Sequence, residues 1–534
     1  MTIIPKKSLY FLIIFLLIGL FLRVLYFHDL TFGYDQARDA LQSISILKSR
    51  DIKIIGPTTD IRGLFHSPFY WYIISPFYYF SGGNPEIARI PMILINLLNI
   101  VFIYFLVKKI FKNEKIALLS SFFMAVSFEA VQYARWLSNP PPALLTTAVF
   151  FYGLWLVLKK EKIGLPLMLF FWGLSVNFQF FLAYQVVFVI FAVIFLLIKD
   201  KKVIIESLKK YFWLYVLSLL SFSFYIAAQL KFKFLGLITF LSFLTKSGEE
   251  KNNLLPKLIS FSNKLIHNLA NNLTARNIFI AKIILIFILG YVIYSLVLKK
   301  KWKKEVLFLF IWFISPIIIY PLQNNDSYFL NIGNLYPLII LVVLMVFELK
   351  SQFKKIGRLL FIIAVGLITM TNVYLILDNN KGGESLFSVQ YKQNLADELK
   401  IIDYLYQSSN KKIFAVNTLT NPLYINTTWA YLFDWYGKKK YGYMPIWWGA
   451  YLDDFGKEIR FSDEKELRVG DKLYLILEPS VFHDDYFKAY VRFDNTRSTL
   501  LKKLDFNTHK VEERRISLIK GFSRDELTNL LQIK

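Results

Sequence analysis

Long apolar runs separated by short clusters of lysines are the feature that most constrains this chain. An apolar run of about 20 residues can cross the hydrocarbon core of a membrane as one helix. We therefore expect a polytopic α-helical membrane protein with about eleven transmembrane helices. The expected spans lie at about Leu9–Tyr26, Ile87–Val107, Ile116–Ala134, from the Pro140–Pro142 break to Leu158, two between Ile163 and Ile198, Tyr211–Gln229, Ile278–Leu298, Val306–Leu322, Leu335–Phe347 and Leu359–Leu377.

The lysine clusters orient these spans. If the spans alternate in direction, the short loops that are rich in Lys and Arg all fall on the side of the N-terminus. Cytoplasmic loops carry an excess of these residues, so that side is predicted to be the cytoplasm. We expect an integral plasma membrane protein whose first connection and C-terminal tail face outward. The loops are Lys108–Lys115, Lys159–Lys162, Lys199–Lys210, Lys299–Lys304 and Lys350–Arg358.

The overall charge and the absence of cysteine limit the possible partners and chemistry. A net charge of +25 would suggest a nucleic-acid partner in a soluble protein. In a membrane protein the expected partners are lipid phosphates and anionic headgroups, so we expect membrane lipids and no nucleic acid. Because the chain has no cysteine, disulfides, thiol catalysis and thiolate-bound metals are excluded.

The composition changes after the last expected span. Residues 1–377 are expected to form a transmembrane domain, and residues 378–534 an external soluble α/β domain. Within that second domain, a helix is predicted over Gln390–Gln407, and strands are predicted over Lys412–Val416 and Lys472–Leu477.

For three further segments, the sequence predicts where they lie relative to the membrane. Ser67–Phe80, in the first connection, is aromatic and interrupted by prolines, which predicts interfacial helices lying on the membrane. Tyr424–Trp448 is unusually aromatic and suits packing on a membrane or holding sugar rings. Lys231–Arg276 is expected to be a long, cationic external connection. Arg23, near the outer end of the first span, is expected to snorkel to the interface.

The stretch Tyr34–Ala40, directly after the first span, is the strongest candidate site. Asp35 and Asp39 are four residues apart, so both carboxylates lie on one face if the stretch is helical, with Arg38 beside Asp35. Carboxylates at a membrane surface suit proton abstraction from a hydroxyl, or metal binding. The alternative is a solvated first turn of a helix in which Arg38 only pairs with Asp35.

Other polar groups cluster in the outward connections. For Arg135 the alternative to ligand binding is an interfacial anchor, and a lone histidine such as His66 is often structural. Glu129 and Gln132 are costly in lipid and are expected to face the bundle interior or its outer end. The candidates for substrate binding are Arg38, Asp39, Arg62, His66, Arg135, Asn139, Lys231 and Lys233.

An outward-facing site is separated from cytoplasmic nucleotides, so an activated donor must arrive in the membrane. A sugar on a polyprenyl phosphate is such a donor, and its phosphate is already a good leaving group. Transfer then needs one base for the acceptor hydroxyl and positive charge for the departing phosphate. Asp35 is the predicted base, and arginines or the lysines of 231–276 are the predicted positive groups.

An ordered set of motifs over about residues 1–377 resembles the integral-membrane glycosyltransferases of fold class C. The most similar groups are the protein O-mannosyltransferase-like and aminoarabinose-transferase-like enzymes. After the acidic stretch, the motifs are Gly56-Pro57, Gly63, His66-Ser67-Pro68, Tyr70, Tyr72, Ala88-Arg89, Arg135, Asn139-Pro140, Tyr328-Phe329-Leu330 and Tyr336-Pro337.

The resemblance implies a polyprenyl-phosphate sugar donor, inverting transfer of a hexosyl or pentosyl group, and an external cavity bounded by the first loop. Many relatives have two adjacent acids in the first loop, and the catalytic one is the first, which corresponds to Asp35 here. The role of Asp39 is open. Many relatives also have an acid near the position of Asn139, so a divalent metal ion stays possible but is not assigned. The acceptor is a protein, lipid or glycan.

Two other classes of function fit a polytopic membrane protein. A transporter or lipid flippase would favour ionisable pairs at mid-membrane, broken helices and repeated halves. The sequence shows no internal repeat, and its acids cluster in an outward loop. A membrane sensor would need a cytoplasmic output domain, for which the sequence offers no candidate. The transferase is therefore the leading interpretation, and the transporter or flippase is the alternative.

Overall fold

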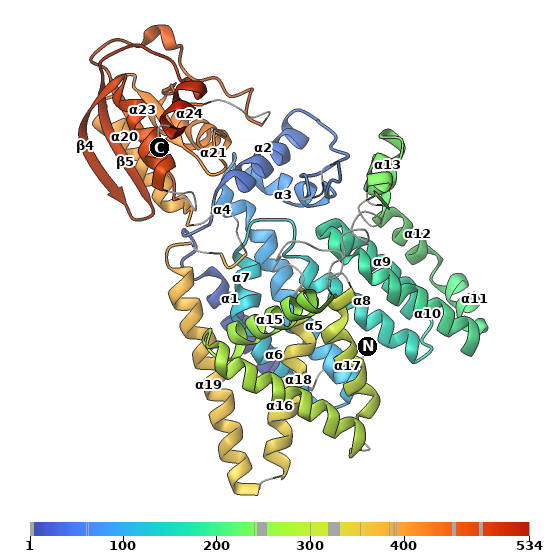
Figure 1. Cartoon of the computed structure of the whole chain (residues 1–534). Helices are drawn as coiled ribbons and strands as arrows, with labels where there is room; N and C mark the ends of the chain where they lie inside the picture. The colour runs from blue at the N-terminus through green and yellow to red at the C-terminus, as the bar shows by residue number, and fades with distance from the viewer. Residues whose placement is uncertain are drawn as a thin grey trace.

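The computed structural model of the chain describes residues 5–59, 61, 63–239, 241–242, 254–299, 301–318, 332–352, 354–383, 385–387, 390, 392–450, 455–479 and 484–532. Arg62 and the Tyr328-Phe329-Leu330 motif lie outside these residues, as does the end of the span expected at Val306–Leu322. Figure 1 shows a body of long helices and, at its upper left, a smaller domain built around a sheet.

Each expected span contains a helix or a pair of helices. In chain order these are α1 (Lys6–Val24), α5 (Ile90–Phe111), the pair α6 (Glu114–Val126) and α7 (Phe128–Arg135), α8 (Ala143–Leu158), α9 (Gly164–Phe178), α10 (Val186–Lys199), the pair α12 (Phe212–Ser221) and α13 (Ser223–Lys231), α16 (Ile278–Val297), α17 (Lys303–Ile314), α18 (Leu335–Gln352) and α19 (Lys354–Asn380). Between them lie α2 (Tyr34–Lys48), α3 (Phe69–Phe80), α4 (Pro85–Ala88), α11 (Lys201–Lys210) and α15 (Leu254–Leu273).

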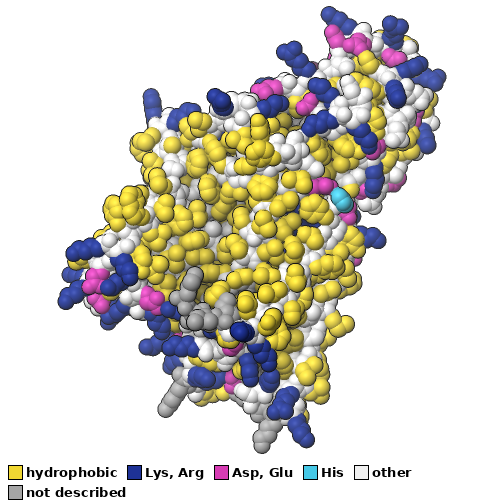
Figure 2. Space-filling view, turned by 180° about the vertical axis from the view of Figure 1, so that it is seen from behind, with side chains coloured by type: hydrophobic (Ala, Val, Ile, Leu, Met, Phe, Trp, Pro, Cys, Tyr) yellow, Lys and Arg dark blue, Asp and Glu magenta, His cyan; other side chains and the backbone are white. Residues whose placement is uncertain are grey.

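The helices have the length and composition of a membrane protein. Among the described residues, 5 helices are long and apolar enough to cross a membrane, or up to 7 if each bent pair is one span. Helices α8 and α9 are apolar but shorter. Hydrophobic side chains cover the middle of the body, and lysines and arginines gather at its lower end (Figure 2). The helical membrane fold is confirmed, while the count of about eleven spans and their orientation stay predictions.

The break between α6 and α7 shows how polar residues shape the body. The two helices are bent by 51° at Ser127. The hydroxyl oxygen of Ser127 caps α7 by accepting from the backbone N–H of Ala130 at 3.2 Å. The same hydroxyl donates to Asn272 of α15 at 2.8 Å. The bend is therefore fixed by capping and by a neighbouring helix.

Helix α15 lies inside the segment expected to be a polar external connection. It packs against α7 and α19, with Asn268 and Asn271 buried. Both asparagines donate to the carboxylate of Glu129, at 2.5 and 3.1 Å, so Glu129 faces the bundle interior. The sequence pattern did not indicate this helix because its buried face includes amides as well as apolar side chains.

The expectation that Arg23 snorkels to the interface is wrong. Its side chain is fully buried. The guanidinium donates to Asn96 Oδ1 at 2.8 Å and to the carbonyl of Ala125 at 3.0 Å, which ties α1 to α5 and α6. Acceptors inside the bundle thus take the place of water for this arginine.

The C-terminal domain is a small α/β domain. Its sheet has the order β2-β1-β3-β5-β4, with β1 parallel to β2 and β3, and β5 antiparallel to β3 and β4. The predicted strand at Lys472–Leu477 is β3, whereas the other predicted strand and the predicted helix both begin later than expected, as β1 and α20. The elements are α20 (Leu395–Ser408), β1 (Ala415–Leu419), α21 (Thr427–Leu432), α22 (Lys438–Tyr441), β2 (Ile446–Trp447), β3 (Lys472–Leu477), α23 (Asp484–Asn495), β4 (Ser498–Phe506), β5 (His509–Ile516) and α24 (Arg524–Gln532).

The first connection and the C-terminal domain share one hydrophobic core. Phe32 and Trp71 of the connection cluster with Leu395 and Tyr431 of the domain. The ring centroids of Phe32 and Tyr431 are 5.5 Å apart. Trp429 is also buried, so much of the aromatic stretch expected to lie on a membrane or hold sugar packs inside the protein. This shared core brings α2 and α3 against the domain (Figure 1).

Candidate active site

Helix α2 presents the acidic stretch in a defined register. It begins at Tyr34, directly after Gly33. The side chain of Gln36 reaches back and accepts a hydrogen bond from the Gly33 N–H at 3.1 Å, which caps the first turn. Asp35 stands in this first turn, where the helix dipole favours negative charge.

The helix brings Asp35, Arg38 and Asp39 into contact, as their spacing predicts. Arg38 Nη1 lies 2.7 Å from Asp35 Oδ1. Nε and Nη2 of the same guanidinium donate to Asp39 Oδ1 at 3.0 and 2.9 Å. One arginine therefore bridges two carboxylates.

The two carboxylates differ in exposure. The side chain of Asp35 is 31% exposed and that of Asp39 is 2% exposed. Asp39 Oδ1 also accepts from Trp71 Nε1 at 2.8 Å. Burial raises the pKa of Asp39, although Arg38 opposes that shift. Asp39 is thus a buried anchor for Arg38, and Asp35 is the carboxylate that reaches solvent.

His66 stands near this cluster as a partly buried, neutral imidazole. Burial, together with the positive charge of Arg38, lowers the pKa of His66 to about 4. Its Nδ1 has no hydrogen-bond partner among the described residues. A histidine in this state supplies an uncharged donor or acceptor at neutral pH.

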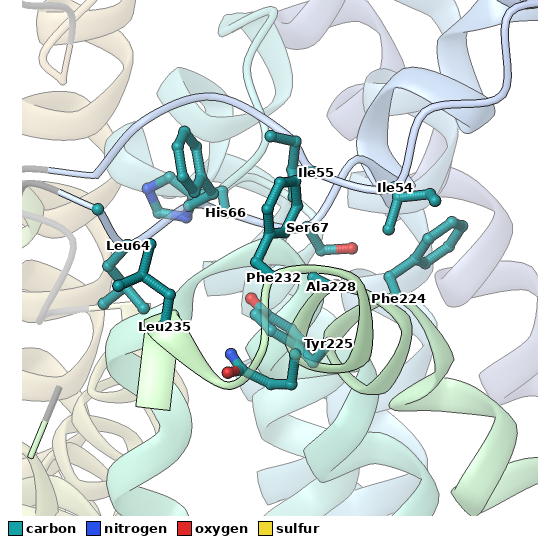
Figure 3. A pocket seen from close by; sticks show the side chains of 14 residues that line it. Ile54, Ile55, Leu64, His66, Ser67, Phe224, Tyr225, Ala228, Phe232 and Leu235 are labelled. Atoms are coloured by element: carbon teal, nitrogen blue, oxygen red, sulfur yellow. The ribbon is translucent and has the colours of Figure 1, made fainter. Parts of the chain in front are cut away.

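A small apolar cavity adjoins His66. Its volume is about 60 Å³, and it lies between the loop of the first connection and α13 with the turn that follows it. Figure 3 shows the aromatic rings of Tyr225 and Phe232 on one side and the His66 loop on the other. The walls are almost wholly hydrophobic, among them Phe224, Tyr225, Phe232 and Leu235.

The predicted lysines lie close to this cavity in the chain. Lys231 ends α13 and Lys233 follows it, and both side chains are exposed. The Lys231 ammonium lies 5.7 Å from the ring centroid of Phe232, which lines the cavity. They are therefore solvent-exposed cations beside an apolar opening.

Arg135 and Asn139 have their hydrogen bonds inside the protein. Arg135 is buried and donates to the carbonyls of Tyr26, Asp29 and Asn380, at 3.1, 2.7 and 3.2 Å. Asn139 is also buried and donates to the carbonyl of Phe178 at 2.7 Å. These contacts join chain segments, and a substrate contact for either residue stays a prediction.

Two residues of the site were not indicated by the sequence. Trp71 lay within an aromatic segment interpreted as interfacial, and its bond to Asp39 depends on how α2 and α3 pack. Gln390 donates to Asp35 Oδ2 at 2.9 Å from 355 residues further along the chain. A lone glutamine in a polar segment carries no local signal of such a contact.

The described residues contain no group of three or more His, Cys, Asp or Glu that could hold a metal ion. In the acidic cluster itself, Arg38 stands between the two carboxylates.

Comparisons with known proteins show a partial match to a glycosyltransferase family model and a similar fold among solved membrane glycosyltransferases. Residues 65–226 match the family model described as dolichyl-phosphate-mannose-protein mannosyltransferase. That segment includes His66, Arg135 and Asn139, and begins after Asp35 and Arg38. No curated protein sequence matches the chain.

The whole fold is similar to that of solved glycosyltransferases. The apo structure of ArnT from Cupriavidus metallidurans superposes with a TM-score of 0.55 at 10% identity, covering 95% of this chain and 98% of that one. ArnT bound to undecaprenyl phosphate gives 0.56 at the same identity and coverage. The oligosaccharyltransferase AglB from Archaeoglobus fulgidus gives 0.48 at 12% identity, covering 90% and 70%.

The chain thus has the fold of the integral-membrane glycosyltransferases of class C. The resemblance inferred from the motifs is confirmed, by the family match over residues 65–226 and by the ArnT fold over nearly the whole chain.

Proposed function

We propose that this protein transfers a sugar from a polyprenyl-phosphate donor to an acceptor hydroxyl on the outer face of the membrane, with inversion at the anomeric carbon. The observation that carries this proposal is the partly exposed carboxylate of Asp35, held by Arg38. In the reaction, the acceptor oxygen attacks the anomeric carbon as its proton passes to Asp35. The bond to the phosphate breaks, and the lipid phosphate leaves with the electron pair.

Asp35 has the free capacity that a base requires. Its Oδ1 accepts from Arg38 and its Oδ2 accepts from Gln390. Because each carboxylate oxygen accepts up to about two hydrogen bonds, each retains a site for a further proton donor. The exposed part of the side chain is where an acceptor hydroxyl would bind.

Arg38 is the candidate for stabilising the departing phosphate. Three of its N–H groups point at carboxylates, and a guanidinium has about five. The remaining N–H groups suit a phosphate oxygen, and positive charge there favours departure. Asp39 and Trp71 would hold the guanidinium in place for this step.

The lipid part of the donor fits the apolar features of the structure. The description of the matched family names dolichyl-phosphate mannose, and one ArnT structure is bound to undecaprenyl phosphate. By analogy, the hydrophobic cavity beside His66 would take part of the lipid near its phosphate, with Lys231 and Lys233 attracting the charged headgroup. The transferred group is a hexose or pentose, and the acceptor a protein, lipid or glycan.

The proposal requires the N-terminus in the cytoplasm and the C-terminal domain outside. Activity reporters fused at Lys534 and within Lys299–Lys304 should therefore report opposite sides of the membrane, because the lysine-rich loops mark the inner side. If both reporters lie in the cytoplasm, the proposed site cannot be on the outer face.

The central test is Asp35→Asn, which keeps the shape and removes the base. General-base catalysis is typically worth about 10²–10⁴-fold, so turnover should fall at least about 100-fold with little change in the donor KM. The assay is transfer from a synthetic polyprenyl-phosphate sugar by purified protein, with the midpoint of thermal unfolding measured alongside. Full activity of this variant would overturn the assignment of Asp35. Loss of activity together with loss of stability would point to a structural role instead.

A further inference from the structure

The C-terminal domain reaches the candidate base directly. We propose that this domain completes the active site by positioning Asp35, and that Gln390 is the positioning residue. The inference rests on the proposed role of Asp35 as the base. It goes further by making the C-terminal domain, with the segment at 390–394 that leads into it, part of the catalytic unit.

The contact joins a buried amide to the partly exposed carboxylate. Gln390 is 5% exposed, and its Nε2 lies 2.9 Å from Asp35 Oδ2. The other oxygen of Asp35 belongs to Arg38 of the same helix. The carboxylate of Asp35 therefore has two donors. Arg38 lies on the same helix, whereas Gln390 lies far along the chain.

The segment that carries Gln390 is fastened to the first connection. The N–H of Leu395 donates to the carbonyl of Leu30 at 2.9 Å, and the N–H of Phe32 donates to the carbonyl of Gln393 at 3.3 Å. Thr31 and Asn394 pair as an isolated antiparallel bridge. These backbone bonds fix where Gln390 stands relative to α2.

A second glutamine anchors the same segment to the sheet. Gln393 Nε2 donates to Glu478 Oε2 at 2.6 Å, and Glu478 directly follows β3. Glu478 also accepts from Trp429 Nε1 at 2.8 Å and from the N–H of Asn421 at 2.6 Å. The end of the sheet thereby holds Gln393, three residues from Gln390.

Gly33 shows how tightly α2 meets this segment. A Cβ there would lie 1.9 Å from Gln393 Oε1 and 2.7 Å from Gln390 Cγ. Its φ of −134° is open to any residue, so space and not backbone conformation demands glycine. The start of α2 is seated on both glutamines.

An amide donor at this position has a definite chemical effect. It restrains the orientation in which Asp35 meets the acceptor. Among the described residues, the charged or titratable groups that interact with Asp35 are Arg38 and Asp39 on its own helix and His66 on the facing loop. Removing the Gln390 amide should therefore leave the base less well oriented.

The test compares two variants of the full chain in the transfer assay, with kcat and the donor KM measured separately. In Gln390→Leu, kcat should fall about tenfold, because the carboxylate loses one of the two donors that orient it. In Gln390→Glu, the donor is replaced by a second carboxylate that faces Asp35, so kcat should fall at least as far. The donor KM should stay unchanged in both.

The matched control is Asn417→Leu. Asn417 makes a buried amide-to-carboxylate contact with Asp494 in the same domain, at 3.0 and 3.1 Å. This variant should lose stability without lowering kcat. A wild-type kcat in both Gln390 variants, or the same fall in kcat in Asn417→Leu, would overturn the positioning role.

The proposed function and this inference fail separately. Full activity of Asp35→Asn overturns the base itself, whatever the Gln390 variants do. The contact is tested without activity by a thermal-unfolding cycle of Gln390→Leu, Asp35→Ala and the double variant. Non-additive midpoints support the contact, and strictly additive midpoints overturn it.

Discussion

Two groups of acidic residues are held in contrasting ways. In α2, Asp35 and Asp39 share the guanidinium of Arg38, and Asp35 is 31% exposed. In the helical body, Glu129 is 2% exposed and is held by the amides of Asn268 and Asn271. The first cluster combines a positive charge with access to solvent. The second combines neutral donors with burial.

The Glu129 network joins helices. Asn372 of α19 accepts from the N–H of Phe128 at 2.7 Å and donates to the carbonyl of Asn272 at 2.6 Å. These contacts link α7, α15 and α19, so the polar groups act as cross-links inside an apolar body. A polar group at membrane depth is often taken as a sign of function. Here, the Asp35 cluster differs from the Glu129 network in being partly exposed and in containing the cation Arg38.

The largest effect within this comparison is expected for Asp39→Asn. Its amide retains an oxygen for Trp71 and Arg38 but loses the charge, so Arg38 should turn more fully toward Asp35. Turnover should fall about tenfold, less than the about 10²–10⁴-fold expected for loss of a base. Steady-state transfer at saturating donor measures this, with thermal unfolding as the control. Equal losses in Asp39→Asn and Asp35→Asn would mean that exposure does not distinguish the two carboxylates.

Local sequence pattern predicted the acidic cluster well. The spacing of Asp35, Arg38 and Asp39 alone places them on one helix face, and the structure shows the bonds that this spacing allows. Apolar length likewise located the apolar helices of the body, although not α15. Both properties depend on residues close in the chain, so no knowledge of tertiary packing was needed.

The remaining parts of the site depend on packing between distant segments. Gln390 meets Asp35, and Trp71 meets Asp39, only because the first connection and the C-terminal domain share a core. Arg23 is buried where a snorkelling side chain was expected, because acceptors on α5 and α6 replace water. The periodicity of a sequence segment carries no information about such contacts, because they depend on how distant segments pack.

A smaller effect is expected at the cationic rim of the cavity. Changing Lys231 and Lys233 together to glutamine should raise the donor KM about threefold, because exposed charges contribute little individually. The kcat should not change, and the difference should shrink at high salt. The matched control replaces Lys209 and Lys210, exposed lysines that end α11. If the donor KM does not change in the Lys231 and Lys233 variant, or rises equally in the control variant, these lysines have no specific role in donor binding.

The smallest effect on turnover is expected for Glu129→Gln. Glutamine keeps one carbonyl oxygen for the amides of Asn268 and Asn271 and nearly the same shape, so transfer should stay within about twofold of wild type. Glu129→Ala leaves both amides without that acceptor and should destabilise the protein by about 1–3 kcal/mol for each. Thermal unfolding in detergent and the transfer assay, run on both variants, separate stability from chemistry. A Glu129→Gln protein that unfolds like wild type but transfers no sugar would show that the buried network takes part in the reaction. The reaction would then involve proton transfer through the helical body as well as at Asp35.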